Sequence, residues 1–471
     1  MDLSSIVKAY DVRGTVPDQL DEPIARAIGA AFIDVTGAQR IVTAHDMRET
    51  GPGLARAFAE GALHRGASVV EAGLGSTDML YFASGHLGLP GAMFTASHNP
   101  AQYNGIKMTR ANAVAIGQDT GLADIGAAAS KYLANGLPPA GVAGTVEQVD
   151  LLTPYAEYLR GLVDLTGIRP LKVVVDAGNG MGGYTVPAVL GDAVLPALPL
   201  TIVPLYFELD GTFPNHEANP LEPKNIVDLQ RAVVAEHADI GIAFDGDADR
   251  CFVVDALGAA VSPSTITALV ATRELAKSPG AKIIYNLITS HAVPEIVREH
   301  GGEPVRTRVG HSFIKAEMAR TQAVFGGEHS AHYYFRDFWN ADTGMLAAMH
   351  VLAALGEHSP AAPPSAVGFP GRTLADLTSQ FSRYVASGEI NSTVDDQAGR
   401  IAAIRAAYSG RAASIDELDG LTVELADGSW FNVRASNTEP LLRLNVEGPD
   451  DSSMAAVRDE ALAIIRAGSA G

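Results

Sequence analysis

The strongest constraint on the fold is a regular alternation of short apolar runs with amphipathic stretches along most of the chain. Residues 41–44, 68–71 and 91–94 are predicted to be strands, and the segments between them carry apolar residues at helical spacing. Such βα alternation builds a largely parallel sheet covered by helices, which binds ligands at the carboxyl ends of its strands. The sequence therefore predicts an α/β protein with its sites in the loops that follow strands.

The alternation recurs three times in 471 residues, a length that exceeds what a single core supports. A Gly- and Pro-rich break at 136–144 precedes the second unit, and 360–370, rich in Pro, Ala and Ser, is predicted to be a linker. Beyond it, strands follow one another without long helices between them, which predicts an α+β domain. We find no sequence repeat of fixed period. The predicted domains are 1–150, 151–258, 259–370 and 371–471.

Charge and cysteine content restrict the partners and the compartment. Lys and Arg number 34 against 54 Asp and Glu, a net charge of -20, which argues against general nucleic-acid binding and against attachment to anionic membranes. Cys251 is the one cysteine, so no internal disulfide forms. Residues 1–10 lack a signal-like apolar stretch, and prolines interrupt the most apolar region, 185–207. We expect a cytoplasmic protein.

The first candidate for chemistry is Thr-Ala-Ser-His-Asn-Pro at 95–100, directly after the predicted strand 91–94. Ser97 is a possible nucleophile, since His98 lies beside it and Lys107 follows ten residues on, both able to handle a proton or a negative charge. An ordinary Ser/Asn turn at a strand end explains this hexapeptide equally well. The other motifs have to decide between these interpretations.

Three carboxylates at alternate positions, Asp245, Asp247 and Asp249, follow another buried strand. Carboxylates that converge from one loop repel each other and suit a hard cation such as Mg²⁺. A calcium EF-hand is excluded, because Arg250 stands in place of its turn glycine and Ala256 in place of its bidentate glutamate. A solvated acidic turn is the weaker alternative, since strongly apolar strands flank the loop.

Two further loops are less specific. The glycine-rich stretch 178–183 matches a dinucleotide fingerprint, but no acidic residue stands clearly about twenty residues on, so we interpret it as a tight βα turn. His329 and His332 lack a third ligand in register for a metal site. Glu328 and Ser330 are better suited to hydrogen-bonding the hydroxyls of a polyol.

Another loop, 434–440 with Arg443 beyond it, joins two predicted strands and is rich in hydroxyl, amide and guanidinium groups. Such a loop can surround a phosphate with donors, whereas an ordinary polar turn would not need flanking arginines. The sequence therefore predicts a phosphate site here.

The motifs at 95–100, 245–250, 327–330 and 434–440, in this order, resemble the α-D-phosphohexomutase superfamily, most closely its phosphomannomutase/phosphoglucomutase branch. The resemblance spans nearly the whole chain. It implies four domains around a central cleft, the first three similar α/β units with mixed, mostly parallel sheets and the fourth an α+β domain that binds phosphate. Residues 10–14, Tyr-Asp-Val-Arg-Gly, are similar to the family's N-terminal signature and would bring Arg13 to the active serine.

The resemblance also implies roles. Ser97 would be the phosphoserine, and its phosphate would bind Mg²⁺ together with Asp245, Asp247 and Asp249. Lys107 is the leading general acid/base, with Arg13 and His98 as competitors. The remaining predicted substrate-binding residues are Arg250, Arg308, His311, Glu328, Ser330, Arg434, Ser436, Asn437, Thr438 and Arg443.

These roles predict an enzyme that interconverts mannose 6-phosphate and mannose 1-phosphate through a hexose 1,6-bisphosphate, which also serves as activator. Mannose phosphate is the preferred substrate, because the loop Gly-Glu-His-Ser-Ala-His differs from the versions typical of phosphoglucosamine mutases and dedicated phosphoglucomutases. Glucose phosphates are expected as further substrates. A phosphoglucosamine mutase and a metal-dependent sugar-phosphate phosphatase are the alternatives. We expect hexose phosphates as ligands, neither nucleic acid nor membrane as partner, and a monomer or weak dimer.

Overall fold

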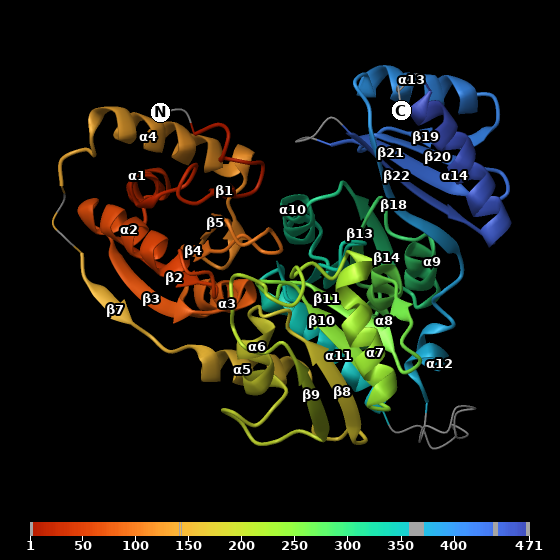
Figure 1. Cartoon of the computed structure of the whole chain (residues 1–471), viewed down its shortest axis with the longest axis horizontal. Coiled ribbons are helices and arrows are strands. Elements are labelled where there is room, and N and C mark those ends of the chain that lie inside the picture. Colours follow the sequence, from red (N-terminus) through yellow and green to blue (C-terminus); the bar gives the residue numbers. More distant parts are fainter. Residues whose placement is uncertain (1–2, 141, 143, 358–371, 437–440, 468–471) are drawn as a thin grey trace. The chain divides into compact units, whose positions relative to one another are not determined.

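The computed structural model describes residues 3–140, 142, 144–357, 372–436 and 441–467. Its elements form two compact units, Met1–Pro263 with Ser330–Leu377 and Ser264–His329 with Thr378–Gly471 (Figure 1). Within these residues no helix has both the length and the apolar character needed to cross a membrane. The predicted linker 360–370 lies outside the described residues.

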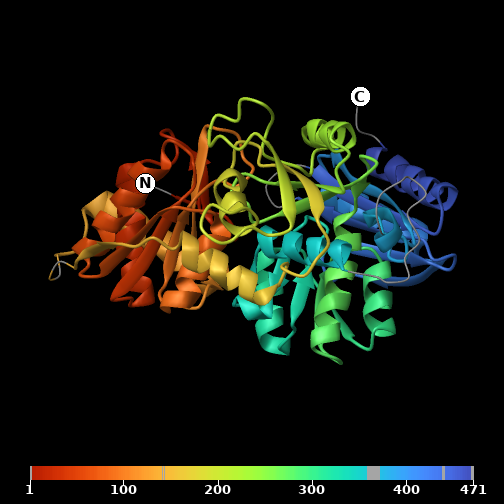
Figure 2. The same cartoon turned by 90° about the horizontal axis from the view of Figure 1, so that it is seen from below.

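The first sheet of the first unit has the strand order β1-β5-β4-β2-β3-β7, with β6 paired to β5. The β2–β4, β2–β3 and β3–β7 pairs are parallel, whereas β5 is antiparallel to both β4 and β1. Figure 2 shows these strands side by side in red to orange. The strands are β1 (Val12–Thr15), β2 (Arg40–His45), β3 (Ser68–Leu74), β4 (Gly91–Phe94), β5 (Tyr103–Arg110), β6 (Val114–Ala115) and β7 (Val146–Gln148).

Helices cover both faces of this sheet, because successive residues of a strand point to opposite sides. Ala92 and Phe94 belong to the core formed with α1, α2 and α4, whereas a side chain at Gly91 would meet Leu80 of α3. Asp21 caps α1 through its side chain and Gly37 ends it in a left-handed conformation. The helices are α1 (Glu22–Thr36), α2 (Gly51–His64), α3 (Thr77–Leu87), the 3₁₀ turn η1 (Gln118–Thr120) and α4 (Leu122–Asn135).

The second sheet has the order β12-β11-β10-β8-β9, parallel from β10 through β9 and antiparallel at β10–β11. The glycine-rich stretch forms the tight turn after β8. The N–H of Met181 donates to the carbonyl of Gly246 at 2.9 Å, and the same carbonyl leaves no room for a side chain at Gly180. The elements are α5 (Leu152–Leu162), β8 (Leu171–Asp176), α6 (Gly182–Val189), β9 (Leu200–Leu205), η2 (Pro223–Ile226), α7 (Val227–Ala235), β10 (Ile240–Phe244), β11 (Cys251–Asp255) and β12 (Ala260–Val261).

The first unit also contains the later segment 330–377. Here β16 pairs antiparallel with β17, and the hydroxyl of Thr343 caps the buried helix α11 by accepting from the N–H of Leu346. The elements are β16 (Tyr333–Phe335), η3 (Arg336–Phe338), β17 (Ala341–Asp342), α11 (Gly344–Gly356) and α12 (Leu374–Thr378), whose last residue is assigned to the second unit.

In the second unit, β13 pairs parallel with both β14 and β15. The register of β15 with β13 pairs Phe325 with Ile283 and places Glu328 directly after the end of the strand. The elements are α8 (Pro263–Lys277), β13 (Lys282–Asn286), α9 (Ala292–Glu299), β14 (Glu303–Thr307), α10 (His311–Thr321) and β15 (Phe325–Gly327).

The last domain is α+β, as predicted, with a five-stranded antiparallel sheet of order β18-β22-β21-β20-β19. Its core contains the inward residues of β20, β21 and β22, covered by α13 and α14. The sequence did not predict β18 and α13. The elements are β18 (Val385–Thr393), α13 (Gln397–Tyr408), β19 (Ala412–Asp416), β20 (Leu421–Leu425), β21 (Trp430–Ala435), β22 (Leu441–Gly448) and α14 (Asp451–Arg466).

Candidate active site

Ser97 lies in the loop that follows β4, where its side chain is near the acidic loop that follows β10. Its Oγ donates to Oδ2 of Asp245 at 2.9 Å and lies 3.3 Å from Nδ1 of His98. Ser97 is only 6% exposed and has a φ of 50°, a left-handed conformation that is uncommon for a residue other than glycine. A buried hydroxyl in such a conformation is not a typical surface turn, and this favours a functional role.

The acidic loop joins β10 to β11 and holds three buried carboxylates whose ligand atoms all lie within 4.8 Å of one another. Burial raises the pKa of Asp245 to about 6, with Arg250 opposing the shift and the charges of Asp249 and Asp247 adding to it. The buried Oδ1 of Asp247 accepts no hydrogen bond from any described residue. Because a hard cation would relieve both the repulsion and the missing partner, this triad fits a bound metal ion such as Mg²⁺.

Lys107 on β5 supplies positive charge to the same loop. The register of β5 with β4 pairs Lys107 with Met93, and its Nζ lies 2.7 Å from Oδ2 of both Asp247 and Asp249. Burial alone would lower the pKa of Lys107, but these two carboxylates outweigh it and hold the pKa well above its usual value. In this arrangement Lys107 is charged and donates to both carboxylates.

His98 and Arg13 differ in what they offer Ser97. Burial, with Arg250 and Arg13 nearby, lowers the pKa of His98 well below its usual value, so its imidazole is neutral and can accept a proton. Arg13 instead donates to the carbonyl of Ala96 at 3.1 Å and to Oδ1 of Asn99 at 2.5 Å, and it pairs with Asp11. Its contacts support the serine loop.

Arg250 is buried within the acidic loop itself. Its Nε and one terminal nitrogen each lie 2.8 Å from Oδ2 of Asp245, the oxygen that also accepts from Ser97. This guanidinium balances charge beside the candidate nucleophile. No contact of Arg250 bears on its predicted role in substrate binding.

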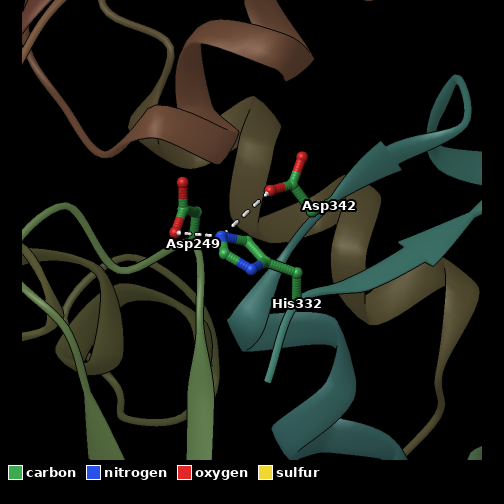
Figure 3. A group of neighbouring side chains, drawn as sticks. All are labelled: Asp249, His332 and Asp342. Carbon is green, nitrogen blue, oxygen red and sulfur yellow. Dashed lines mark ion pairs between the residues drawn. The ribbon is translucent and has the colours of Figure 1, made fainter. Parts of the chain in front are cut away.

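His332 lies between two carboxylates, those of Asp249 and Asp342, an arrangement that the sequence did not predict (Figure 3). The Nε2 of His332 lies 3.5 Å from Oδ1 of Asp249 and 3.9 Å from Oδ2 of Asp342, which ends β17, while Nδ1 lies 3.1 Å from Oγ of Ser330. A β-bridge between Arg250 and His332 fixes this approach. His332 therefore links Ser330, a predicted sugar-binding residue, to Asp249 of the acidic triad.

The start of α3 holds the acidic loop from another side, which the sequence also did not predict. The Oγ1 of Thr77 donates to Oδ2 of Asp247 at 2.5 Å, and the N–H of Thr77 donates to the carbonyl of Asp247. The adjacent carboxylate of Asp78 is fully buried and accepts from the hydroxyls of Ser76, Tyr155 and Thr343, the last two at 2.7 Å. Asp78 thereby ties α3 to α5 and to the cap of α11.

Asp78 should give the protein a measurable pH dependence of stability. Burial raises the pKa of Asp78 to about 6, against the three hydroxyl donors, so the folded state binds a proton more tightly than the unfolded state. Its contribution to stability is present below about pH 6 and is lost as pH rises through that value. Relative to Asp78→Asn, wild-type protein in EDTA should gain about 1 kcal/mol between pH 7 and pH 5 in denaturant titrations. An equal pH dependence of both proteins would contradict this assignment.

Three of the predicted substrate-binding residues, Glu328, Arg308 and His311, belong to the second unit and follow strands β15 and β14. Glu328 is buried and its Oε2 accepts from Nδ2 of Asn286 at 3.0 Å and from the N–H of Gly310 at 3.4 Å. Arg308 is exposed and its guanidinium lies 4.7 Å from the ring centroid of Phe313. His311 begins α10, and its side chain lies outside the described residues.

The predicted phosphate site has one feature that the sequence did not reveal. Glu389 on β18 accepts from both arginines of the predicted phosphate site, at 2.9 Å from Arg434 and at 3.0 Å from Arg443. The facing pair Arg434 and Arg443 on β21 and β22 is thus held by one carboxylate. The N–H of Ser436 donates to the carbonyl of Leu441, and Asn437 and Thr438 lie outside the described residues.

Four successive parts of the chain each match a domain model of one known family. The four domain models of the phosphoglucomutase/phosphomannomutase family, alpha/beta/alpha domains I, II and III and the C-terminal domain, match residues 4–134, 153–258, 262–367 and 389–464. The chain belongs to the phosphoglucomutase/phosphomannomutase family. It is therefore a phosphohexomutase, and the α-D-phosphohexomutase superfamily predicted from the sequence is confirmed, together with four domains of α/β type.

Individual members of the family are similar to this chain over nearly its full length. The chain is 41% identical to a phosphomannomutase from Escherichia coli, covering 98% of both chains, and 40% identical to the phosphohexose mutases of Xanthomonas campestris pv. campestris, covering 96% of this chain and 97% of the relative. A solved phosphoglucomutase/phosphomannomutase family structure from Burkholderia thailandensis has a TM-score of 0.85 at 33% identity, covering 100% of this chain and 99% of the other.

Proposed function

We propose that this family member interconverts mannose 6-phosphate and mannose 1-phosphate through a phosphoserine at Ser97. The observation that carries the proposal is the 2.9 Å contact of Ser97 Oγ with Asp245, inside a buried group of carboxylates and cations. Relatives named phosphomannomutase, 41% identical over nearly the whole chain, support mannose as the sugar. Glucose phosphates are proposed as further substrates.

The reaction consists of two opposite phosphoryl transfers. In the first, the bond between Ser97 Oγ and phosphorus breaks, a bond from phosphorus to O6 of mannose 1-phosphate forms, and the proton of the O6 hydroxyl passes through the general acid/base to Oγ. The 1,6-bisphosphate then reverses its orientation without leaving. In the second, the bond from phosphorus to O1 breaks, phosphorus returns to Ser97 Oγ, and the proton of the Ser97 hydroxyl passes through the general acid/base to O1. A hexose 1,6-bisphosphate from solution would reload an enzyme that has lost its phosphate.

The groups around Ser97 fit these steps. Mg²⁺ held by Asp245, Asp247, Asp249 and a phosphoserine oxygen would neutralise the charge of the transferred group. Lys107, whose Nζ contacts Asp247 and Asp249, is proposed as the general acid/base, with His98 and Arg13 as competitors. Arg13 holds the serine loop through Ala96 and Asn99.

The remaining predicted roles belong to substrate recognition. Glu328 and Ser330 are proposed to bind sugar hydroxyls, an acceptor and a donor that suit a polyol. The phosphate that does not react is proposed to bind the loop of the last domain, where Glu389 orients two arginines. The residues for that phosphate are Arg434, Ser436, Asn437, Thr438 and Arg443, with Arg250, Arg308 and His311 as further contacts. The domain limits 1–150, 151–258, 259–370 and 371–471, a cytoplasmic location and a monomer or weak dimer stay predictions.

A coupled assay with the 1-phosphates of mannose, glucose and glucosamine tests the proposal. We expect the highest kcat/KM with mannose 1-phosphate, glucose 1-phosphate within about a hundredfold, and glucosamine 1-phosphate below both. Glucose repositions the 2-hydroxyl of mannose and glucosamine replaces it by an amino group, and each change alters transition-state binding by about 1 to 3 kcal/mol. Activity should require catalytic amounts of hexose 1,6-bisphosphate and a divalent cation.

Inorganic phosphate measured in the same reactions separates the alternatives. Stoichiometric release of phosphate from mannose 1-phosphate would replace the mutase proposal by a phosphatase. A preference for glucosamine 1-phosphate would identify a phosphoglucosamine mutase instead.

A further inference from the structure

Arg48, in the loop between β2 and α2, is buried next to Ser97 and has no role in the steps above. Its side chain is 1% exposed. One terminal nitrogen donates to the carbonyls of Pro100 and Tyr103, both at 2.9 Å. The other donates to the carbonyl of Ser97 at 3.0 Å and to that of Asn99 at 2.6 Å. Four carbonyls of the serine loop, here the segment 95–103 that contains Ser97, therefore converge on one guanidinium.

The guanidinium is itself fixed from two sides. Asp46, also buried, accepts from the N–H of Arg48 at 2.9 Å and lies 3.3 Å from its Nε. The ring of Phe213 lies 5.1 Å from the guanidinium carbon, and a side chain at Gly211 would come within 2.8 Å of the Arg48 Cα. The planar fork therefore has little freedom to turn, and its donors hold the carbonyls in one geometry.

Ser97 needs such a restraint because its backbone conformation is unfavourable. Its φ of 50° lies in the left-handed region, which is unfavourable for a residue other than glycine. Its carbonyl is held by Arg48 on one side, and a side chain at Gly246 would come within 2.4 Å of the same oxygen on the other. Turning this peptide would swing Oγ away from Asp245, which lies 2.9 Å from it.

We propose that Arg48 is a positioning residue for phosphoryl transfer, whose guanidinium fixes the Ser97 backbone so that Oγ faces the acidic triad. The inference rests on the proposed role of Ser97 as the phosphoserine. Arg48 touches no reacting atom, and its effect reaches the chemistry through the four carbonyls. Its loss should therefore slow phosphoryl transfer much more than it weakens sugar binding.

Arg160 provides a matched control. It also clamps three carbonyls of one loop, those of Val189, Pro196 and Gly191 at 2.8, 2.6 and 2.7 Å, but none belongs to the serine loop. We expect Arg48→Met to lower kcat about a hundredfold, the usual result of a misplacement of about 1 Å, and to change KM for mannose 1-phosphate less than about threefold. Arg160→Met should leave kcat within about threefold of wild type.

Three further measurements distinguish positioning from general stability. Arg48→Lys should recover only part of the rate, because an ammonium lacks the planar fork for four carbonyls. Guanidinium chloride at non-denaturing concentration should accelerate single-turnover transfer in Arg48→Ala and have no such effect in Arg160→Ala. The phosphorus NMR signal of phosphorylated Ser97 should move in Arg48→Met and stay in place in Arg160→Met.

The outcomes separate this inference from the proposed function. Lack of phosphorylation at Ser97 in wild type would overturn the proposed function itself. Phosphorylated wild type with equal transfer rates in Arg48→Met and wild type would overturn the role of Arg48 alone. If Arg48→Met does not fold, Arg48→Lys decides the matter: an unchanged kcat overturns the proposal, and a reduced kcat with an unchanged KM supports it.

Discussion

Replacing Ser97 by alanine should abolish mutase turnover, lowering kcat at least about a thousandfold, because it removes the oxygen proposed to carry the phosphoryl between the two oxygens of the sugar. The change removes a hydroxyl that donates to Asp245 and leaves the loop contacts of Arg48 intact. Binding of mannose 1-phosphate, measured by calorimetry, should therefore change little. The same variant should gain no phosphoryl group in intact-protein mass spectra after incubation with glucose 1,6-bisphosphate.

Ser84→Ala is the control for this experiment. Ser84 on α3 is also fully buried, and its Oγ donates to the carbonyl of Leu89 at 2.6 Å, away from the serine loop. This variant should lose about 1 kcal/mol of stability and keep wild-type kcat. If Ser97→Ala kept more than a tenth of wild-type turnover, Ser97 could not be the phosphoserine.

Replacing Asp247 by asparagine should produce the second largest effect. Asp247 offers one oxygen to Thr77 and Lys107 and another that accepts no hydrogen bond from the described residues. The amide keeps the shape but removes a negative charge from the cation site, so affinity for Mg²⁺ and charge neutralisation in the transition state both fall. We expect kcat to drop about a thousandfold and the Mg²⁺-dependent rise in Tm to disappear.

The matched control is Asp255→Asn at the opposite end of β11. Asp255 is a buried carboxylate whose Oδ1 accepts from the N–H groups of Leu257 and Ala259 in a turn. This variant should lose stability yet keep the Tm response to Mg²⁺. An unchanged Mg²⁺ response in Asp247→Asn would show that the triad is not the cation site.

Much of the site could be predicted from the sequence because it consists of short motifs at strand ends. Ser97 and the three aspartates follow the apolar strands β4 and β10, and an apolar run bounded by polar loop residues is a local signal. Asp21 and Gly37 likewise mark both ends of α1 by local capping chemistry. In each case the information lies within a few neighbouring residues.

Residues with no such local signal were missed. Strand β5 carries the buried polar residue Asn104 and the charged Lys107, so its apolar pattern is broken, and only its neighbours explain why a polar strand is buried there. Thr77 and Asp78 resemble an ordinary helix start, and Arg48 an ordinary loop cation. Thr77 contacts a residue 170 positions away in the chain, Asp78 one 265 positions away, and Arg48 residues up to 55 positions away.

The sequence by itself determined the family, the α/β character of the chain and the identity of the candidate nucleophile and cation ligands, because each depends on residue types at fixed short spacing. The tertiary structure decided which charges meet: Lys107 with two aspartates, His332 with Asp249 and Asp342, and Arg48 with the carbonyls of the serine loop. The physical reason is that burial makes an unpaired charge costly, so each buried ion is defined by partners that only the folded chain brings within hydrogen-bonding distance.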